Sequence, residues 1–118
     1  TFYMKTKYIT AFTILSLFFS MNLFAQKTEE IKVWGNCGMC KKTIEAAALK
    51  AGASVANWNK ETKVLTVEFK ERKTNAQKIQ ESIANAGYDT QDVTAPADSY
   101  GKLPECCQYS RKETDKKQ

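Results

Sequence analysis

Two cysteines three positions apart are the residues of this sequence best suited to chemistry. Cys37 and Cys40 lie in the stretch "VWGNCGMC" (33–40), directly after an alternating apolar run. A pair at this spacing can bind a metal ion, exchange a disulfide or close a short loop. A bridge across so short a loop adds little stability, so we interpret the pair as chemical rather than architectural.

The neighbouring residues predict how the pair is positioned. Residues 30–35 alternate, with Ile31 and Val33 on one face, and predict a strand. From Cys40 the period becomes helical, with Ile44, Ala47, Ala48 and Ala51 on one face and Gly52 as the stop. One thiol should therefore lie on the loop and the other at the helix start, where amide N–H groups favour the thiolate.

A pair of thiolates selects soft or borderline ions. Sulfur ligands favour Cu(I), Zn(II), Hg(II) and Cd(II), and a two-residue spacer lets both sulfurs approach one ion at about 2.3 Å. The chain contains no histidine, so imidazole is excluded both as a ligand and as a general base. No carboxylate pair lies near the loop in sequence, and we expect no enzymatic activity.

The remaining elements predict a small α+β domain. Residues 53–58 and 63–70 predict a hairpin around "NKET", and Thr74 with Gln77 resembles a capping box for a helix whose inner face holds Ile79, Ile83 and Ala86. Residues 88–93, after Gly87, predict a last short strand. The order is the ferredoxin-like βαββαβ plan, a four-stranded antiparallel sheet with two helices on one face.

The last part of the chain carries two further thiols. Residues 95–118 are rich in turn formers and end in the charged stretch "SRKETDKKQ", so we expect a largely flexible tail. Within it lies the small apolar island "LPECCQY" with Cys106 and Cys107. We hypothesise that the island folds back so that one or both cysteines complete a three- or four-sulfur site, which would favour tetrahedral Zn(II) or Cd(II). The alternative is a mobile tail with incidental or intermolecular thiols.

Residues 4–25 predict a signal peptide. Lys5 and Lys7 precede the apolar run "YITAFTILSLFF", and Ala25 offers a cleavage site before Gln26. An uncleaved signal anchor is the alternative. We expect a periplasmic or otherwise exported protein with no membrane contact after cleavage. Residues 26–118 contain 16 Lys and Arg against 13 Asp and Glu, an excess too mild and dispersed for a nucleic-acid partner.

The sequence resembles the heavy-metal-associated domain family over residues 28–94. The resemblance rests on "VWGNCGMC", "IEAAALKAG", "ETKVLTVEF" and "ESIANAGYD", each at the expected distance from the others. Exported copper chaperones, periplasmic mercury-binding proteins and modules of metal-pumping ATPases belong to this family. The resemblance implies that Cys37 and Cys40 are the metal ligands and that Tyr88 shields the site. Gly35 stands where the family usually has a methionine that packs under the loop.

From these observations we expect a monomeric protein that binds a soft ion, with Cu(I) favoured, and transfers it by ligand exchange. The partner would be a metal-transporting ATPase or another metal-transfer protein. A thiol-disulfide oxidoreductase that uses the same cysteines is the alternative. Trp34 is not adjacent to Cys37, however, and both prolines lie in the tail, unlike the thioredoxin arrangement.

Overall fold

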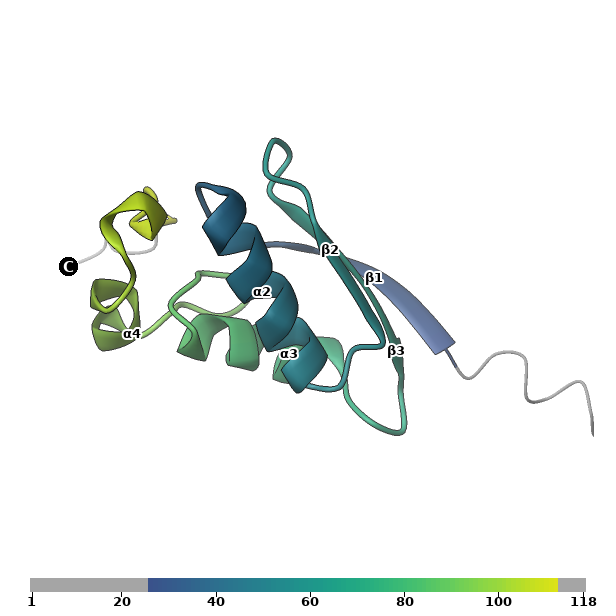
Figure 1. Ribbon diagram of the computed structural model, residues 1–118. Helices are drawn as coiled ribbons and strands as arrows, with labels where there is room; N and C mark the ends of the chain where they lie inside the picture. The colour runs from purple at the N-terminus through teal and green to yellow at the C-terminus, as the bar shows by residue number, and fades with distance from the viewer. Residues whose placement is uncertain (1–25, 113–118) are drawn as a thin grey trace, which may run out of the picture.

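A computed structural model describes residues 26–112, which form an α+β domain followed by a folded C-terminal segment (Figure 1). The elements occur in the order β1 (Gln26–Lys32), α2 (Gly38–Lys50), β2 (Val55–Trp58), β3 (Val64–Lys70), α3 (Ala76–Asn85), α4 (Ala97–Gly101) and the 3₁₀ helix η2 (Glu105–Cys107). The predicted signal peptide lies outside the described residues. None of the helices within residues 26–112 has the length and apolar character needed to cross a membrane.

The sheet is antiparallel with strand order β1-β3-β2. Ile31 of β1 and Trp58 of β2 both pair with Leu65 at the centre of β3. Alternation along β3 places Leu65, Val67 and Phe69 in the core, while the residues between them are partly exposed. This register confirms the predicted hairpin and its inner face, because a shift by one residue would expose all three.

The prediction of a fourth strand is wrong: among residues 26–112 the sheet has three strands. Residues 88–93 contribute an isolated bridge between Val33 and Thr90 instead of a strand. Local bonds take the backbone groups that a longer ladder would need: the Thr90 N–H donates to the Val93 carbonyl (2.8 Å), and the Asp92 N–H donates to Gln80 Oε1 (3.0 Å). A local turn at Thr90 and the Gln80 side chain of α3 therefore compete with strand pairing.

Both long helices pack on one face of the sheet (Figure 1), as predicted. The buried side chains of α2 are Cys40, Ile44, Ala47 and Ala48, and those of α3 include Ile79 and Ile83. Gly52 and Gly87, which follow the two helices, both have φ of +110°. Only glycine adopts this backbone conformation without strain, so each marks its helix stop as expected.

The start of α3 differs from the predicted capping box by one residue. Asn75 is the N-cap, and its side chain accepts a hydrogen bond from the Lys78 N–H at 2.8 Å. Thr74 is buried, and its hydroxyl has no hydrogen-bond partner. Asn75 rather than Thr74 therefore caps the helix, and the threonine side chain lies in the core.

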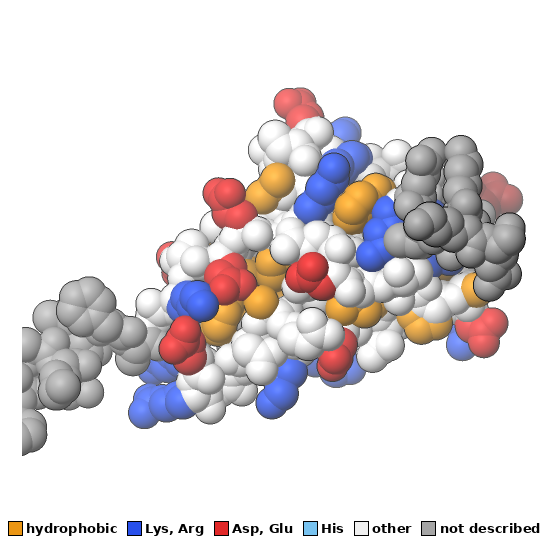
Figure 2. Space-filling model, turned by 180° about the vertical axis from the view of Figure 1, so that it is seen from behind, with side chains coloured by type: hydrophobic (Ala, Val, Ile, Leu, Met, Phe, Trp, Pro, Cys, Tyr) orange, Lys and Arg blue, Asp and Glu red, His pale blue; other side chains and the backbone are white. Residues whose placement is uncertain are grey.

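The C-terminal segment differs from the expected flexible tail over residues 95–112. Figure 1 shows the segment folded back along the helical side of the domain, with the yellow turn that follows α4 near the start of α2. Cys107 and Tyr109 are buried in the same core as the sheet and helices. Seen from behind, the surface carries interspersed positive and negative side chains with only scattered apolar ones (Figure 2). Large exposed apolar side chains among the described residues are Met39, Leu49 and Val55.

Candidate metal centre

The loop between β1 and α2 and the first turn of α2 bring the two predicted thiols together, with 3.5 Å between their sulfur atoms. Cys37 is the N-cap of α2, with extended backbone, and its carbonyl accepts the first helical hydrogen bond from the Lys41 N–H. Its side chain is half-buried. Cys40 lies within the first turn on the inner face of α2 and is fully buried. The pair therefore spans the boundary between solvent and core.

Trp58 occupies the space beneath this loop. Its indole N–H donates to the Val33 carbonyl at 3.0 Å, and a Cβ placed on Gly35 would lie 2.9 Å from the Trp58 ring. The Lys63 ammonium donates to the Gly35 carbonyl at 2.7 Å and lies 5.3 Å from the centre of the Trp58 ring. A tryptophan from β2 thus supports the loop where the family usually uses a methionine.

Cys107 joins Cys37 and Cys40 to form a three-sulfur cluster. The Cys37 Sγ lies 3.5 Å from Cys40 Sγ and 3.7 Å from Cys107 Sγ, and all three sulfurs lie within 4.8 Å of one another. All four cysteines of the described residues are free thiols. Three sulfurs on one ion at about 2.3 Å are about 4.0 Å apart in a trigonal arrangement. The cluster thus has the dimensions of a trigonal thiolate site.

The protonation states within the cluster differ. The Cys40 backbone N–H stabilises the Cys37 thiolate, and together with the Cys40 and Cys107 side chains and the Met39 N–H it lowers the pKa of Cys37 to about 7 despite partial desolvation. Burial, reinforced by hydrogen bonds to Cys40 and Cys37, raises the pKa of Cys107 to about 12. The metal-free cluster at neutral pH therefore combines a partly ionised Cys37 with a protonated Cys107.

Tyr109 holds the tail against the domain. Its hydroxyl donates to the Gly87 carbonyl at 2.8 Å and accepts from the Asp89 N–H at 2.7 Å. The ring stacks on Tyr88, with centroids 5.7 Å apart, and meets Tyr100 edge-on. Because Tyr109 is two residues beyond Cys107, these contacts determine where that thiol lies.

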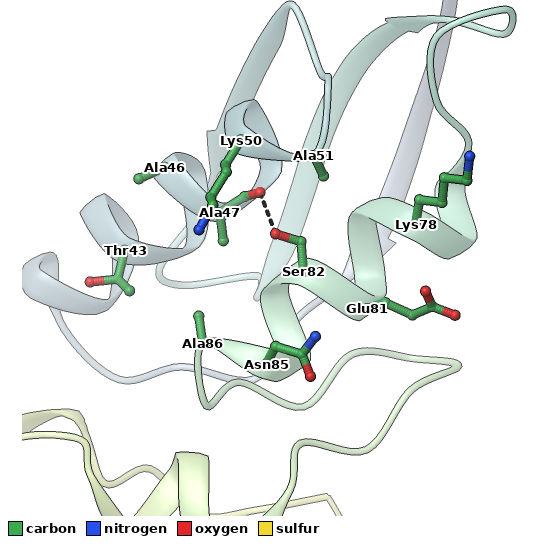
Figure 3. A pocket seen from close by; sticks show the side chains of 10 residues that line it. All are labelled: Thr43, Ala46, Ala47, Lys50, Ala51, Lys78, Glu81, Ser82, Asn85 and Ala86. Carbon is green, nitrogen blue, oxygen red and sulfur yellow. Dashed lines mark hydrogen bonds between the residues drawn. The ribbon is translucent and has the colours of Figure 1, made fainter.

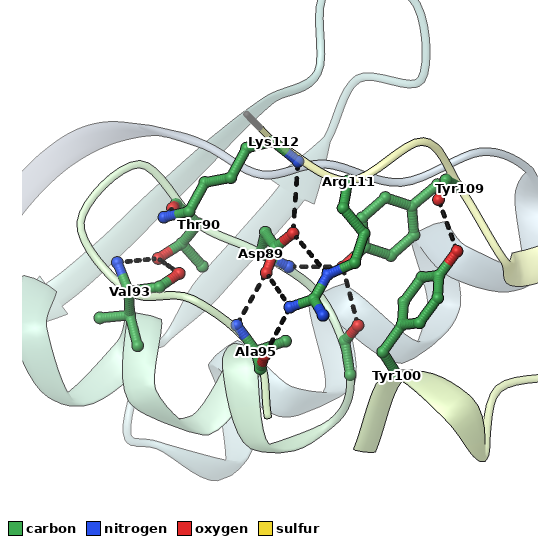
Figure 4. Close-up of polar contacts among 9 residues, drawn as sticks. Asp89, Thr90, Val93, Ala95, Tyr100, Tyr109, Arg111 and Lys112 are labelled. Atoms are coloured by element: carbon green, nitrogen blue, oxygen red, sulfur yellow. Dashed lines mark hydrogen bonds and ion pairs between the residues drawn. The ribbon is translucent and has the colours of Figure 1, made fainter. Parts of the chain in front are cut away.

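An ion pair anchors the same segment further along (Figure 4). Arg111 binds both carboxylate oxygens of Asp89 at 3.1 and 2.9 Å, and the Ala95 N–H donates to Asp89 Oδ1 at 2.7 Å. Burial opposes ionisation of Asp89, but Arg111 and the backbone donors outweigh it and hold the pKa below the usual range. A charged anchor of this kind was not visible in the sequence, where Arg111 is one residue of a charged run.

Tyr88 lies beside the cluster and is almost fully buried. Burial raises its pKa, and the neighbouring Cys40 and Cys107 thiols add to this shift. Its phenol therefore stays protonated at neutral pH. This position agrees with the expectation that Tyr88 shields the thiols.

Cys106 stays outside the three-sulfur cluster. It is exposed at the rim, with its Sγ 3.8 Å from Cys107 Sγ and 3.6 Å from the Met39 thioether. Sequence reasoning treated Cys106 and Cys107 alike. The two neighbouring cysteines separate because successive side chains of a 3₁₀ helix point in different directions.

A shallow groove elsewhere on the surface does not involve the thiols. It lies between α2 and α3 and is lined mainly by small and polar side chains, including Ala46, Ala47 and Ser82 (Figure 3). The Ser82 hydroxyl closes it at one point by donating to the Ala47 carbonyl at 2.8 Å. Since no cysteine lines this groove, the sulfur cluster is the stronger candidate for the functional site.

Comparisons with known proteins agree with this geometry. Residues 36–89 match the model of the heavy-metal-associated domain. The structure of oxidized MerP from Ralstonia metallidurans CH34 is 33% identical over 57% of this chain and 96% of its own, with a TM-score of 0.54. A CopZ metallochaperone is 29% identical over 54% of this chain and 98% of its own, with a TM-score of 0.52.

The fold also occurs in a transporter module. The N-terminal domain of a potential copper-translocating P-type ATPase from Bacillus subtilis, solved in the Cu(I)-loaded state, has a TM-score of 0.51 and is 23% identical over 60% of this chain and 98% of its own. No curated protein matches the chain.

Proposed function

Since this chain belongs to the heavy-metal-associated domain family, we propose that it binds one soft metal ion through Cys37, Cys40 and Cys107 and transfers it to a partner by ligand exchange. The observation that carries the proposal is the mutual approach of the three sulfurs within 4.8 Å. Soft-metal binding follows from the family and from the all-sulfur donor set. The third ligand, the ion and the partner are the finer parts of the proposal.

Cu(I) is the ion that this donor set suits best. Three thiolates satisfy a trigonal soft ion. Zn(II) and Cd(II), which we expected additional sulfurs to favour, prefer four ligands, and the cluster brings together three. Cys106 would have to turn inward to supply the fourth sulfur. Hg(II) shares the preference for thiolates and is the main competitor. Uptake replaces the thiol protons by the ion, so binding should release protons and strengthen as pH rises.

Transfer would begin at Cys37. This thiol is half-buried, while Cys40 and Cys107 are fully covered. Cys37 can therefore be the first sulfur to leave the ion, and the two buried sulfurs follow before a partner thiolate takes the ion over. A module of the same fold on a metal-transporting ATPase is the partner we favour, and another metal-transfer protein is the alternative.

We further propose that the protein is exported, monomeric and without catalytic activity. Residues 4–25 have the composition of a signal peptide, and the absence of histidine removes the commonest general base. The alternative, a thiol-disulfide oxidoreductase, is favoured by the 3.5 Å distance between Cys37 and Cys40 and by the lowered pKa of Cys37. A third thiol in contact with the pair favours metal binding instead.

Anaerobic titration of the reduced protein with Cu(I), Zn(II) and Hg(II) in competition tests the proposal. We expect one equivalent of Cu(I) and, by X-ray absorption, three sulfur neighbours. Cys107→Ser should leave two sulfurs, and Cys37→Ser or Cys40→Ser should abolish tight binding. Cys106→Ser is the matched control and should retain three. Binding that survives loss of both Cys37 and Cys40 would contradict the proposal, and rapid disulfide exchange without metal uptake would favour the oxidoreductase.

A further inference from the structure

Met39 is a large apolar residue whose side chain is exposed to solvent. It is 54% exposed, whereas the neighbouring positions of α2 that face inward are buried. Leu49 and Val55 are comparably exposed, but their side chains carry no group that could bind a metal ion. Met39 lies instead within 3.6 Å of the Cys106 thiol, which donates to its thioether. An exposed thioether beside an exposed thiol is the donor set that soft monovalent ions prefer.

The pair connects directly to the buried cluster. Cys106 Sγ lies 3.6 Å from Met39 Sδ on one side and 3.8 Å from Cys107 Sγ on the other. Cys107 in turn is 3.7 Å from Cys37. These distances are close to the roughly 4 Å expected between sulfurs that share one ion. An ion could therefore move along this row while it remains bound to two sulfurs at every stage.

The backbone also holds Cys106 in place beside the loop. The Asn36 side-chain amide donates to the Cys106 carbonyl at 3.4 Å, and Tyr109 anchors the chain three residues later. Met39 belongs to the first turn of α2. Both members of the pair are thus attached to elements that already carry the cluster, so their proximity does not depend on a free chain end.

We propose that Met39 and Cys106 form a second, solvent-facing site that admits and releases Cu(I) at the three-sulfur cluster. This proposal rests on the proposed function. The site takes soft monovalent cations, with Cu(I) as the cargo and Ag(I) as a redox-inert probe. A thioether is a poor ligand for Zn(II), so the route should discriminate between ions at entry.

The transfer needs no oxidant. Cu(I) first binds the Cys106 thiolate and the Met39 thioether, and the Cys106 proton leaves to solvent. Cys107 then loses its proton to solvent and forms a bond to copper as the bond to Met39 breaks. Finally Cys37 and Cys40 bind as thiolates, with their remaining protons released to solvent, and the bond to Cys106 breaks as Cys106 takes up a proton from solvent. Release follows the same steps in reverse, and copper remains Cu(I) throughout.

The test measures the rate of metal transfer separately from affinity. Reduced full-length protein loaded with Cu(I) or Ag(I) is mixed with a chromophoric chelator in a stopped-flow instrument. We expect Met39→Leu and Cys106→Ser each to slow transfer by about tenfold. Equilibrium affinity should stay within about twofold of the wild type, because entry and exit slow equally. Zn(II) transfer should not change with Met39→Leu.

Two controls separate a site from a steric effect. Met39→Leu preserves the volume of the side chain, and Leu49→Met adds a thioether at the far end of the same helix. Adding Leu49→Met to Met39→Leu should not restore the rate. Wild-type transfer rates in Met39→Leu, or equal slowing of Zn(II), would overturn the proposal. A parallel fall in affinity would also overturn it by making Met39 a resident ligand.

The same experiment distinguishes failure of this inference from failure of the proposed function. If Cu(I) binding depends on Cys37 but Met39→Leu transfers it normally, only the entry site is wrong. If the wild-type protein takes up neither Cu(I) nor Ag(I), both the proposed function and the proposed entry site are wrong.

Discussion

At the scale of single residues, the same thiol group behaves differently in three surroundings. Cys37 receives backbone N–H groups at the start of α2, which favour its thiolate. Burial and hydrogen bonds to Cys40 and Cys37 raise the pKa of Cys107 and favour its protonated form, although a hydrogen bond to Tyr88 opposes this shift. Cys106, the next residue along the chain, is exposed. Position relative to the helix start and the core therefore decides which sulfur reacts first.

This difference predicts the order of alkylation in the metal-free protein. Because the thiolate is the nucleophile, the reaction of Cys37 with iodoacetamide should increase with pH and reach half its maximum rate near pH 7. Cys107 should remain unmodified over the same range, since burial raises its pKa to about 12.

Peptide mass spectrometry of samples quenched at successive times measures both rates. Cys37→Ser should remove the phase near pH 7 and serves as the control. A midpoint near the ordinary thiol pKa of about 8.5 would contradict the assignment, as would early modification of Cys107.

At the scale of elements, the metal loop depends on β2 as much as on its own helix. Trp58 ends β2, and its ring lies against Gly35 where a side chain would otherwise pack. The loop can thus be supported without the family's usual methionine. Trp58 can take the place of the methionine because its large ring fills the space that a glycine in the loop leaves free.

Gly35→Ala should therefore lower the free energy of unfolding by about 1–3 kcal/mol, since its Cβ would lie 2.9 Å from Trp58. Gly38→Ala is the matched control, because a Cβ there meets no atom within 4 Å. That variant should be neutral or slightly more stable. Urea denaturation of both variants measures the difference, and equal stabilities would mean that Trp58 does not restrict the loop.

The start of α3 offers a second test at this scale. Thr74→Val removes a buried hydroxyl that has no partner and should raise the free energy of unfolding by about 1 kcal/mol.

Asn75→Ala removes the N-cap bond to Lys78 and should lower the free energy of unfolding by about 1 kcal/mol. Thermal unfolding followed by circular dichroism distinguishes them. A loss of stability in Thr74→Val would instead indicate that Thr74 caps the helix.

At the scale of the whole molecule, the C-terminal segment links domain stability to the three-sulfur cluster. Tyr109 and Arg111 bind backbone and side-chain groups of residues 87–95, and Cys107 lies immediately before this anchor. Substitutions at Asp89 should therefore change both the stability of the fold and the position of the Cys107 sulfur.

Asp89→Asn should reduce stability at neutral pH by roughly 2 kcal/mol, because it weakens a buried charged contact with Arg111. The folded-state pKa of Asp89 is lowered, so its contribution is fully present above the ordinary pKa of about 4. That contribution is lost as pH falls through the folded-state pKa. The wild type should therefore destabilise more steeply than the variant below about pH 4.

Urea unfolding at pH 7 and at successively lower pH measures this effect. Asp98→Asn, at an exposed position of α4, is the control and should change little. Parallel pH profiles for the wild type and Asp89→Asn would show that the ion pair does not stabilise the tail.

The fold could be predicted from the sequence wherever a regular hydrophobic period coincided with clear stops. The alternation of Leu65, Val67 and Phe69 and the glycines after both helices are examples. Residues 88–93 also looked like a strand, but side chains of Gln80 and Thr90 bind the backbone groups a ladder would use. The Gln80 contact joins residues 12 positions apart in the sequence, which a local pattern does not contain.

The sequence by itself determined that any metal site would be built from sulfur, because the chain has four cysteines and no histidine. It also placed Cys37 and Cys40 on a loop and a helix start. Only the tertiary structure decided that Cys107 joins them while Cys106 contacts Met39. That arrangement depends on the binding of Tyr109 to Gly87 and of Arg111 to Asp89, and each of these contacts joins residues 22 positions apart in the sequence. Local periodicity specifies elements, but long-range packing specifies which side chains share a site.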